Sequence, residues 1–172
     1  LDLDAGWNWV GYTPQATLDV NVALSNIPDG NGQFLKSQSG YADYYSGFGW
    51  FGTLENMSPF LGYLLRLTAD TQFTYNENVL ASTSSVVHAE LSNDELNIHD
   101  YENNGTLTTA IYIDDERVDS YDYELRAYDG STCVGYAEGM YFPLDGNIIF
   151  PLMVYGNESG NLLSMEVYNK IT

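Results

Sequence analysis

Carboxylate side chains are concentrated between residues 114 and 124, in the sequence DDERVDSYDYE. Ca²⁺ binds six to eight oxygen atoms supplied by carboxylates and backbone carbonyls, so this run is a candidate calcium site. It lacks the D-x-D-x-D-G order of an EF-hand loop, and solvated turn residues between two strands would give the same composition. The candidate calcium ligands are Asp114, Asp115, Glu116, Asp119 and Asp122. No other cofactor is expected.

Aromatic residues are dense between residues 41 and 51, in the sequence YADYYSGFGWF. A sugar-binding surface needs two or three exposed rings beside amide or carboxylate groups that hydrogen-bond to hydroxyls. The rings alternate between both faces of an expected strand, so they cannot all be buried in one small unit. The candidate glycan-binding residues are Gln38, Tyr41, Asp43, Tyr44, Tyr45 and Trp50.

Two further tryptophans occur in GWNWVGYTP, residues 6–14. Residues at i and i+2 of a strand point to the same face, so Trp7 and Trp9 would lie side by side. They could form part of a core or an exposed platform for a sugar ring. Packing is the more common fate of such residues, so we expect both indoles in the core and recognition on residues 41–51.

Nothing in the sequence has the spacing of a catalytic or phosphate-binding motif. His88 and His99 are the only histidines, and they do not have metal-ligand spacing. Cys133 lies in the alternating run STCVGYA, which indicates a buried thiol that packs as a small apolar group. We therefore expect a protein that is not an enzyme.

The strongest global feature is charge. Twenty-four acidic and five basic residues give a formal net charge of −19, which disfavours binding to nucleic acid and to anionic membranes. Hydrophobic residues make up 44% of the chain, which is enough for a packed core. No apolar run is long enough for a transmembrane helix, so no membrane insertion is expected. The opening LDLDAG is typical of a processed terminus or an excised fragment.

The elements that must position these residues are mostly strands. Residues 1–78 are expected to form an aromatic-rich β module with one short helix at about 18–27, where Val20, Ala23, Leu24 and Ile27 have helical spacing. Residues 79–95 are expected to be a linker or a first strand. Residues 96–172 have the strand and turn spacing of an antiparallel β-sandwich. The expected fold class is therefore mostly β.

The motifs GWNWVGYTP, KSQSGYADYYSGFGWFGTL and PFLGYLLRL resemble the GWN-type repeat modules of large secreted bacterial surface proteins. DSYDYELRAYDGSTCVGYA and IIFPLMVYGNESGNLLSMEVYN resemble the immunoglobulin-like β-sandwich module that accompanies them, often ahead of gliding-type secretion sorting domains. Val134 stands where an arginine commonly follows the cysteine, so no role of that arginine is carried over. The resemblance implies a secreted or cell-surface location and this architecture, with no enzymatic activity and no established ligand.

Two functions are preferred over a third, a small hydrolase that would need two carboxylates about 5 to 10 Å apart in a cleft. The first is a non-catalytic extracellular or cell-surface module for adhesion or for assembly of an extracellular structure, as a subunit that polymerises by strand addition at a sheet edge. Its partners would be other extracellular proteins or copies of itself. The alternative is a carbohydrate-binding module that uses exposed aromatic residues of the first half to bind a polysaccharide.

Overall fold

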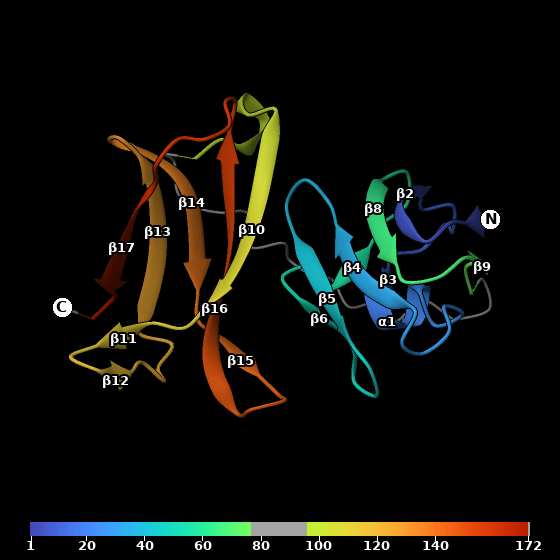
Figure 1. Cartoon of the computed structure of the whole chain (residues 1–172), viewed down its shortest axis with the longest axis horizontal. Coiled ribbons are helices and arrows are strands. Elements are labelled where there is room, and N and C mark those ends of the chain that lie inside the picture. The colour runs from blue at the N-terminus through green and yellow to red at the C-terminus, as the bar shows by residue number, and fades with distance from the viewer. Residues whose placement is uncertain (77–95, 172) are drawn as a thin grey trace. The chain divides into compact units, whose positions relative to one another are not determined.

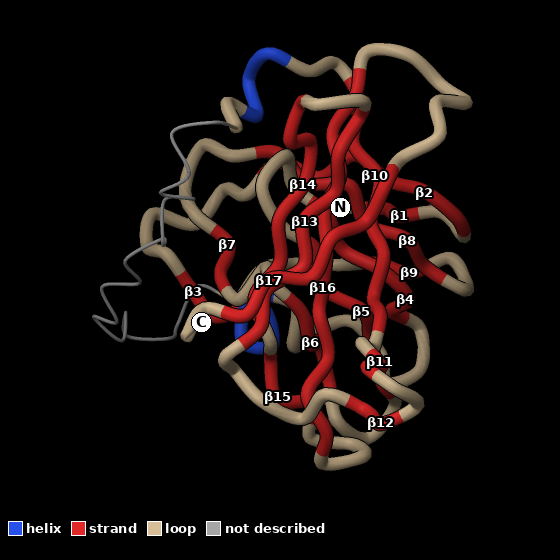
Figure 2. The backbone as a smooth tube through the Cα atoms, turned by 90° about the vertical axis from the view of Figure 1, so that its left-hand side faces the viewer, coloured by secondary structure: helices blue, strands red, loops and turns tan. Residues whose placement is uncertain are grey.

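The structure is a computed structural model that describes residues 1–76 and 96–171. The chain divides into two compact units, residues 1–87 and 88–172. Strands dominate the regular structure of both units, as Figure 2 shows, and the expected mostly β class is confirmed. Residues 79–95, expected to be a linker or a first strand, lie outside the described residues.

The first unit is built on a five-stranded antiparallel sheet with the strand order β2-β8-β4-β5-β6 (Figure 1). These strands are β2 (Gly6–Gly11), β4 (Gly32–Lys36), β5 (Tyr41–Tyr45), β6 (Gly49–Gly52) and β8 (Gly62–Leu67). Two short antiparallel pairs complete the unit: β1 (Asp2–Leu3) with β9 (Thr71–Gln72), and β3 (Leu18–Asp19) with β7 (Asn56–Met57). Strands β2 and β6 are therefore the two edges of the main sheet.

The helix of this unit is shorter than the expected range of 18–27, since α1 covers only Val20–Ala23. The side chain of Asp19 caps it by accepting hydrogen bonds from the backbone N–H groups of Asn21 and Val22. After this single turn the chain continues in tight turns, so the apolar spacing of residues 20–27 still buries Leu24 and Ile27. The spacing indicated the buried face correctly and overestimated the helix length.

One face of the five-stranded sheet carries the core of the first unit. In β8, Tyr63, Leu65 and Leu67 are buried on that face, while Leu64 and Arg66 point to the other. The core also receives residues from α1, from the short strand pairs and from the segment that follows β9. The opposite face of the sheet, called here the outward face, is not part of this core.

The second unit is built on a six-stranded antiparallel sheet (Figure 1). Its strand order is β10-β16-β14-β13-β17, and β15 pairs with β16 outside this order. The strands are β10 (Asn103–Thr109), β13 (Tyr123–Asp129), β14 (Thr132–Glu138), β15 (Met140–Phe142), β16 (Asn147–Gly156) and β17 (Ser164–Asn169). A hairpin of β11 (Tyr112–Ile113) and β12 (Glu116–Arg117) and the 3₁₀ helix η1 (Ile98–Asp100) complete the unit. The finer likeness to an immunoglobulin fold stays a prediction.

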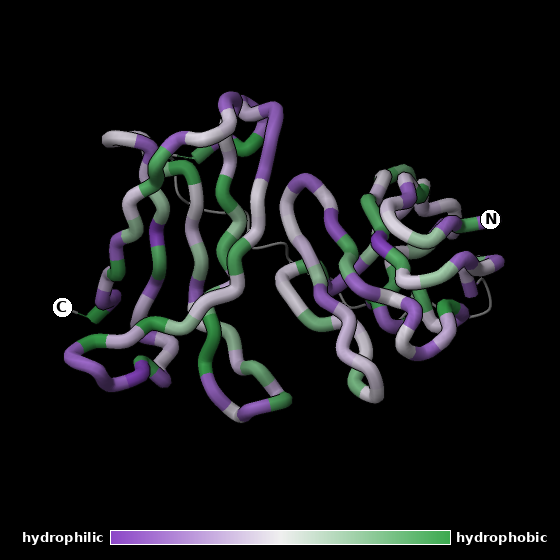
Figure 3. The backbone as a smooth tube through the Cα atoms, viewed as in Figure 1, coloured by the Kyte–Doolittle hydropathy of each residue, from purple (hydrophilic) through white to green (hydrophobic). Residues whose placement is uncertain are grey.

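The long strand β16 supplies much of the core of this unit. It has an extended apolar stretch, visible as green tube in Figure 3, and Ile148, Phe150 and Leu152 are buried in the core. Ile111 and Val118, which flank the β11–β12 hairpin, pack in the same core. The sheet combines pairs of consecutive strands, β13–β14 and β15–β16, with the distant pairs β10–β16 and β13–β17.

Candidate functional site

The tryptophans of β2 lie on the outward face. Their exposed fractions are 52% for Trp7 and 83% for Trp9, while Val10 and Tyr12 are buried in the core. The expectation that both indoles belong to the core is therefore wrong. The alternation within the strand was read correctly, but the core side of β2 is the one that carries Val10 and Tyr12.

Strand register places further residues of the outward face in rows with these tryptophans. One row crosses all five strands, and its members in strand order are Trp7, Arg66, Phe34, Asp43 and Phe51. A second row contains, in the same order, Trp9, Leu64, Lys36 and Tyr41. Residues directly opposite each other in adjacent strands are close enough for their side chains to interact. The outward face thus combines aromatic rings with three charged groups.

Ring contacts fix the side chains of this face. The Trp7 and Phe34 rings meet edge to face with centroids 6.0 Å apart, and Phe34 stacks on Tyr41 at 5.6 Å. The Arg66 guanidinium carbon lies 5.5 Å from the Trp7 ring centroid. Each such contact contributes on the order of 0.5–1.5 kcal/mol. Trp7 is consequently held in one orientation while half of its surface remains exposed.

The charges of the outward face stand in partly buried positions. Burial lowers the pKa of the Lys36 ammonium and raises the pKa of the Asp43 carboxyl. Burial, followed by the nearby Asp43 charge, also raises the pKa of Tyr45. Arg66 forms no ion pair with a carboxylate in residues 1–76 or 96–171. Lys36 and Arg66 are the only basic residues between positions 1 and 76, so this face gathers the positive charge of an acidic unit.

The candidate glycan-binding residues are divided between the two faces of the sheet. Tyr41, Asp43 and Tyr45 occupy outward-facing positions of β5, although Tyr41 is buried beneath its neighbours. Tyr44 packs against the core from the opposite face. Gln38 is exposed in the turn between β4 and β5. The structure therefore brings together half of the proposed set.

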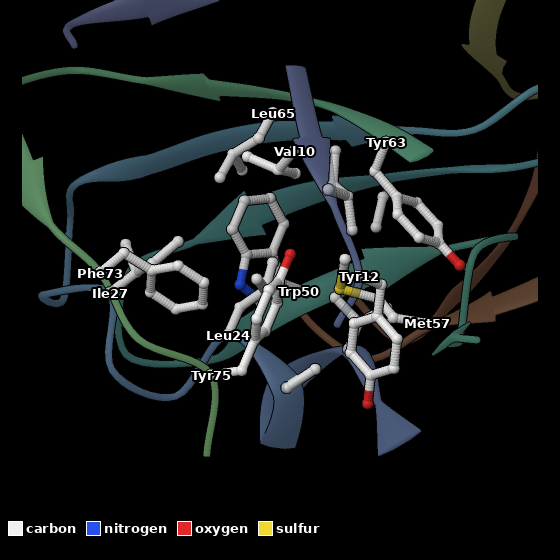
Figure 4. Packing of buried hydrophobic residues seen from close by; sticks show 14 of the residues in the cluster. Val10, Tyr12, Leu24, Ile27, Trp50, Met57, Tyr63, Leu65, Phe73 and Tyr75 are labelled. Carbon is white, nitrogen blue, oxygen red and sulfur yellow. The ribbon is translucent and has the colours of Figure 1, made fainter. Parts of the chain in front are cut away.

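Trp50, a candidate glycan-binding residue, is buried with an exposed fraction of 8%, so it is not part of an exposed sugar-binding surface. Figure 4 shows its indole surrounded by core residues, among them Val10, Leu24 and Tyr75. The Asn21 side chain accepts a hydrogen bond from the Trp50 backbone N–H at 2.6 Å and donates one to its carbonyl at 3.1 Å. Strand β6 is thereby fixed with Trp50 facing inward, and the glycine-rich turn before it does not expose the ring.

Tyr44 has a structural role in the same region. Its hydroxyl donates a hydrogen bond to Asp29 at 2.5 Å, and Ser46 and the Gly47 backbone N–H also donate to this carboxylate. These donors hold the pKa of Asp29 below its usual value, with the Tyr44 hydroxyl as the main cause. The Tyr44 ring packs edge-on against Trp50, at 5.1 Å between centroids. Tyr44 therefore ties the loop that carries Asp29 to the sheet.

The candidate calcium ligands are dispersed in the structure. Asp114 and Asp115 form the exposed turn between β11 and β12 with left-handed φ values of 52° and 66°, and Glu116 begins β12. Asp119 accepts a hydrogen bond from the Ile148 backbone N–H, and Asp122 accepts one from the Ser120 hydroxyl. Across residues 1–76 and 96–171, no three His, Cys, Asp or Glu side chains are grouped so as to hold a metal ion.

The residues considered for catalysis do not form a site either. Cys133 is buried, as expected, and its thiol lies 3.5 Å from the Gly135 carbonyl oxygen. His99 is exposed in η1, and His88 lies outside the described residues. The expectation of a non-catalytic protein stays a prediction.

Sequence reasoning missed Phe34, Lys36 and Arg66 as neighbours of the tryptophans. The alternation of YLLRLT already separates Arg66 from the buried Leu65 and Leu67. It does not show that β8 lies between β2 and β4, which is what places Arg66 between Trp7 and Phe34. Strand order was the missing information.

Comparison with protein-family models, curated proteins and solved structures finds no match to this chain. None of the helices in the part of the chain that the structure describes has the length and apolarity to cross a membrane. The outward face of the first unit is accordingly a candidate binding site that rests on its own geometry.

Proposed function

We propose that this chain is a non-catalytic module of an extracellular or cell-surface protein that adheres to polysaccharide through the outward face of its first unit. The single observation that carries the proposal is the pair Trp7 and Trp9, both exposed on one face of an edge strand. Large exposed apolar groups of this kind mark interaction sites more often than chance would place them.

The chemistry of the face suits a sugar chain. The C–H face of a pyranose packs against an indole, and hydroxyls require nearby hydrogen-bonding groups. Asp43, Lys36 and Arg66 supply such groups in the same two rows as the tryptophans. Trp7 is already held by Phe34 and Arg66, so binding there costs little side-chain entropy.

The proposal is tested by measuring binding of the whole chain to insoluble and soluble polysaccharides. Trp9→Ala is expected to weaken binding by about tenfold or more, equivalent to about 1.4 kcal/mol, because the stacking surface is lost. Tyr112→Ala is the control, since it removes an exposed aromatic ring from the second unit. Saturable binding should also change tryptophan fluorescence through Trp7 and Trp9, while the buried Trp50 remains shielded.

Failure to bind any polysaccharide would reject this proposal. Equal loss of binding in the Trp9→Ala and Tyr112→Ala variants would reject the assignment to the outward face. A change of fluorescence that persists in Trp9→Ala and disappears in Trp7→Ala would move the contact to the Arg66 end of β2.

A second candidate function is assembly with other copies of the chain, and one observation favours it. Strand β17 lies at the edge of the second sheet, and its core-side residues Met165 and Val167 are 45% and 42% exposed. A polymer formed by donating a terminal strand would leave that strand without a partner in its own chain. Strands β1 and β17 both have internal partners, which is why we place glycan binding first.

A further inference from the structure

Two glycines face each other on the outward face next to Trp9. Gly11 of β2 is paired with Gly62 of β8, and this pair follows the Trp9–Leu64 pair along the same two strands. Residues two apart in a strand point to the same face, so side chains at both positions would stand beside the Trp9 indole. The two glycines leave bare backbone there, called here the glycine step.

The fold does not require glycine at either position. Neither residue has a left-handed φ, and a Cβ atom added to either would meet no atom within 4 Å. Other glycines of the same sheet differ, because a Cβ on Gly32 would lie 2.7 Å from the Trp50 ring and one on Gly52 would lie 2.3 Å from the Tyr41 carbonyl oxygen. Glycine weakens a strand, so Gly11 and Gly62 lower the stability of the folded chain. Neither backbone conformation nor steric crowding requires glycine at these two positions.

The backbone at the glycine step is nevertheless held in place. The Tyr75 hydroxyl donates a hydrogen bond to the Gly11 carbonyl oxygen at 3.1 Å, and the Tyr12 backbone N–H donates one to the Leu61 carbonyl oxygen at 3.0 Å. Tyr75 is a core residue, and burial together with Tyr12 and Tyr63 raises its pKa to about 12. The step is thus a preorganised surface, and glycine in a strand often marks a place where a ligand approaches the backbone closely.

We infer that the glycine step and the Trp9 indole form one subsite for an uncharged pyranose unit of a polysaccharide. This inference rests on the proposed function and specifies the ligand. The pyranose lies over the bare backbone of Gly11 and Gly62 and presents a C–H face to the indole, which is 83% exposed. A side chain at either glycine would occupy the space that the sugar needs.

The charge of the chain and of the residues around the subsite indicates which class of sugar binds there. Trp9 and Leu64 border the step and are apolar, and the nearest charged residue in the Trp9 row is Lys36, two strands away from β2. The chain carries a net charge of −19, which repels acidic polysaccharides and also a second copy of the chain. A neutral sugar chain meets no such opposition.

The test compares glycine variants of the whole chain for binding to neutral polysaccharides, namely cellulose, starch, xyloglucan and galactomannan, with polygalacturonate as the acidic probe. Gly62→Ala and Gly62→Val are expected to bind the neutral polysaccharide about tenfold or more weakly than the unmodified chain. The melting temperature of Gly62→Ala is expected to stay unchanged or rise, because the added Cβ meets no atom within 4 Å and restricts the unfolded chain. Gly105→Ala is the matched control, a strand glycine of the second unit that also lacks a left-handed φ.

The outcomes separate this inference from the proposed function. If Trp9→Ala loses binding while both Gly62 variants retain it, the proposed function stands and the subsite is overturned. Binding only to polygalacturonate overturns the neutral ligand class, and absence of all binding removes both proposals. If Gly62→Val lowers the melting temperature, its loss of binding is set aside, and the binding measured for Gly62→Ala decides whether the subsite stands. Self-association that Gly62→Val abolishes, without glycan binding, would assign the step to a protein partner and overturn the inference.

Discussion

Asp43 and Asp29 are two carboxyl groups of the first unit in opposite environments. Burial on the outward face raises the pKa of Asp43, so its charged form is less favourable in the folded chain than in the unfolded chain. Hydrogen-bond donors around Asp29, led by the Tyr44 hydroxyl, lower the pKa of that residue. The first carboxylate opposes folding at neutral pH and the second supports it. A carboxylate kept on the outward face at a cost to stability fits a role in binding.

These opposite shifts predict opposite pH profiles for two isosteric variants. Asp43→Asn should raise the melting temperature at pH 7, and the gain should shrink as the pH falls and the wild-type carboxyl becomes protonated. Asp29→Asn should lower the melting temperature at pH 7, and this loss should fade as the pH falls through the lowered pKa of Asp29 in the folded chain. Thermal unfolding between pH 3 and pH 7 measures both. Profiles of the same sign would contradict the assigned environments.

At the scale of elements, the two edge strands β2 and β17 differ in what they expose. Strand β2 presents tryptophans on the face away from the core, while β17 presents Met165 and Val167 on the core side of its sheet. An exposed edge with apolar residues invites pairing with another chain. The first arrangement suits a ligand that lies on a face, and the second suits a partner that covers an edge.

The edge of β17 carries the prediction for assembly. If copies associate there, sedimentation velocity should show oligomers that increase with protein concentration, and Val167→Lys should convert them to monomers because lysine at an edge opposes strand addition. Tyr112→Lys adds the same charge at an exposed site of the β11–β12 hairpin and serves as the control. A wild-type chain that stays monomeric at all concentrations would reject self-assembly at this edge.

At the scale of the whole molecule, the charge is distributed unevenly. Residues 1–79 contain eight acidic and two basic residues, and residues 80–172 contain sixteen and three. The described ion pairs, Arg117–Asp145, Arg126–Glu124 and Lys170–Glu138, all belong to the second unit and use every basic residue there. Most carboxylates consequently have no cationic partner and repel one another.

This repulsion predicts a salt response. Raising NaCl from about 0.01 M to about 1 M shortens the screening length from about 30 Å to about 3 Å, so the melting temperature at pH 7 should rise. Near the sequence pI of about 4.1 the net charge is small, and the same change of salt should have little effect. Binding to a neutral polysaccharide should be insensitive to salt in this range. A melting temperature that falls with salt at pH 7 would show that the three ion pairs outweigh the repulsion.

Much of the fold followed from local pattern. The strand and turn spacing of residues 96–172 corresponds to the antiparallel strands of the second unit. The helical spacing of residues 20–27 corresponds to residues that are buried. The burial of Cys133, predicted from the alternation in STCVGYA, is likewise confirmed. These features depend on periodicity within a few residues, which the sequence contains in full.

The make-up of the candidate site depended on strand order and on which face of the sheet is covered, and local pattern contains neither. Alternation shows that Trp7 and Trp9 share a face, and that Trp50 and Phe51 point to opposite faces, but it does not say which face is covered. That choice follows from the packing of α1, Asn21 and Tyr75 on one side of the sheet. The order β2-β8-β4 is equally non-local, and it alone brings Arg66 beside Trp7 and Gly62 beside Gly11. The sequence by itself therefore determined the strands, their two faces and the charge. Only the tertiary structure decided which aromatic residues meet solvent, because burial is a property of what packs against a strand and not of the strand.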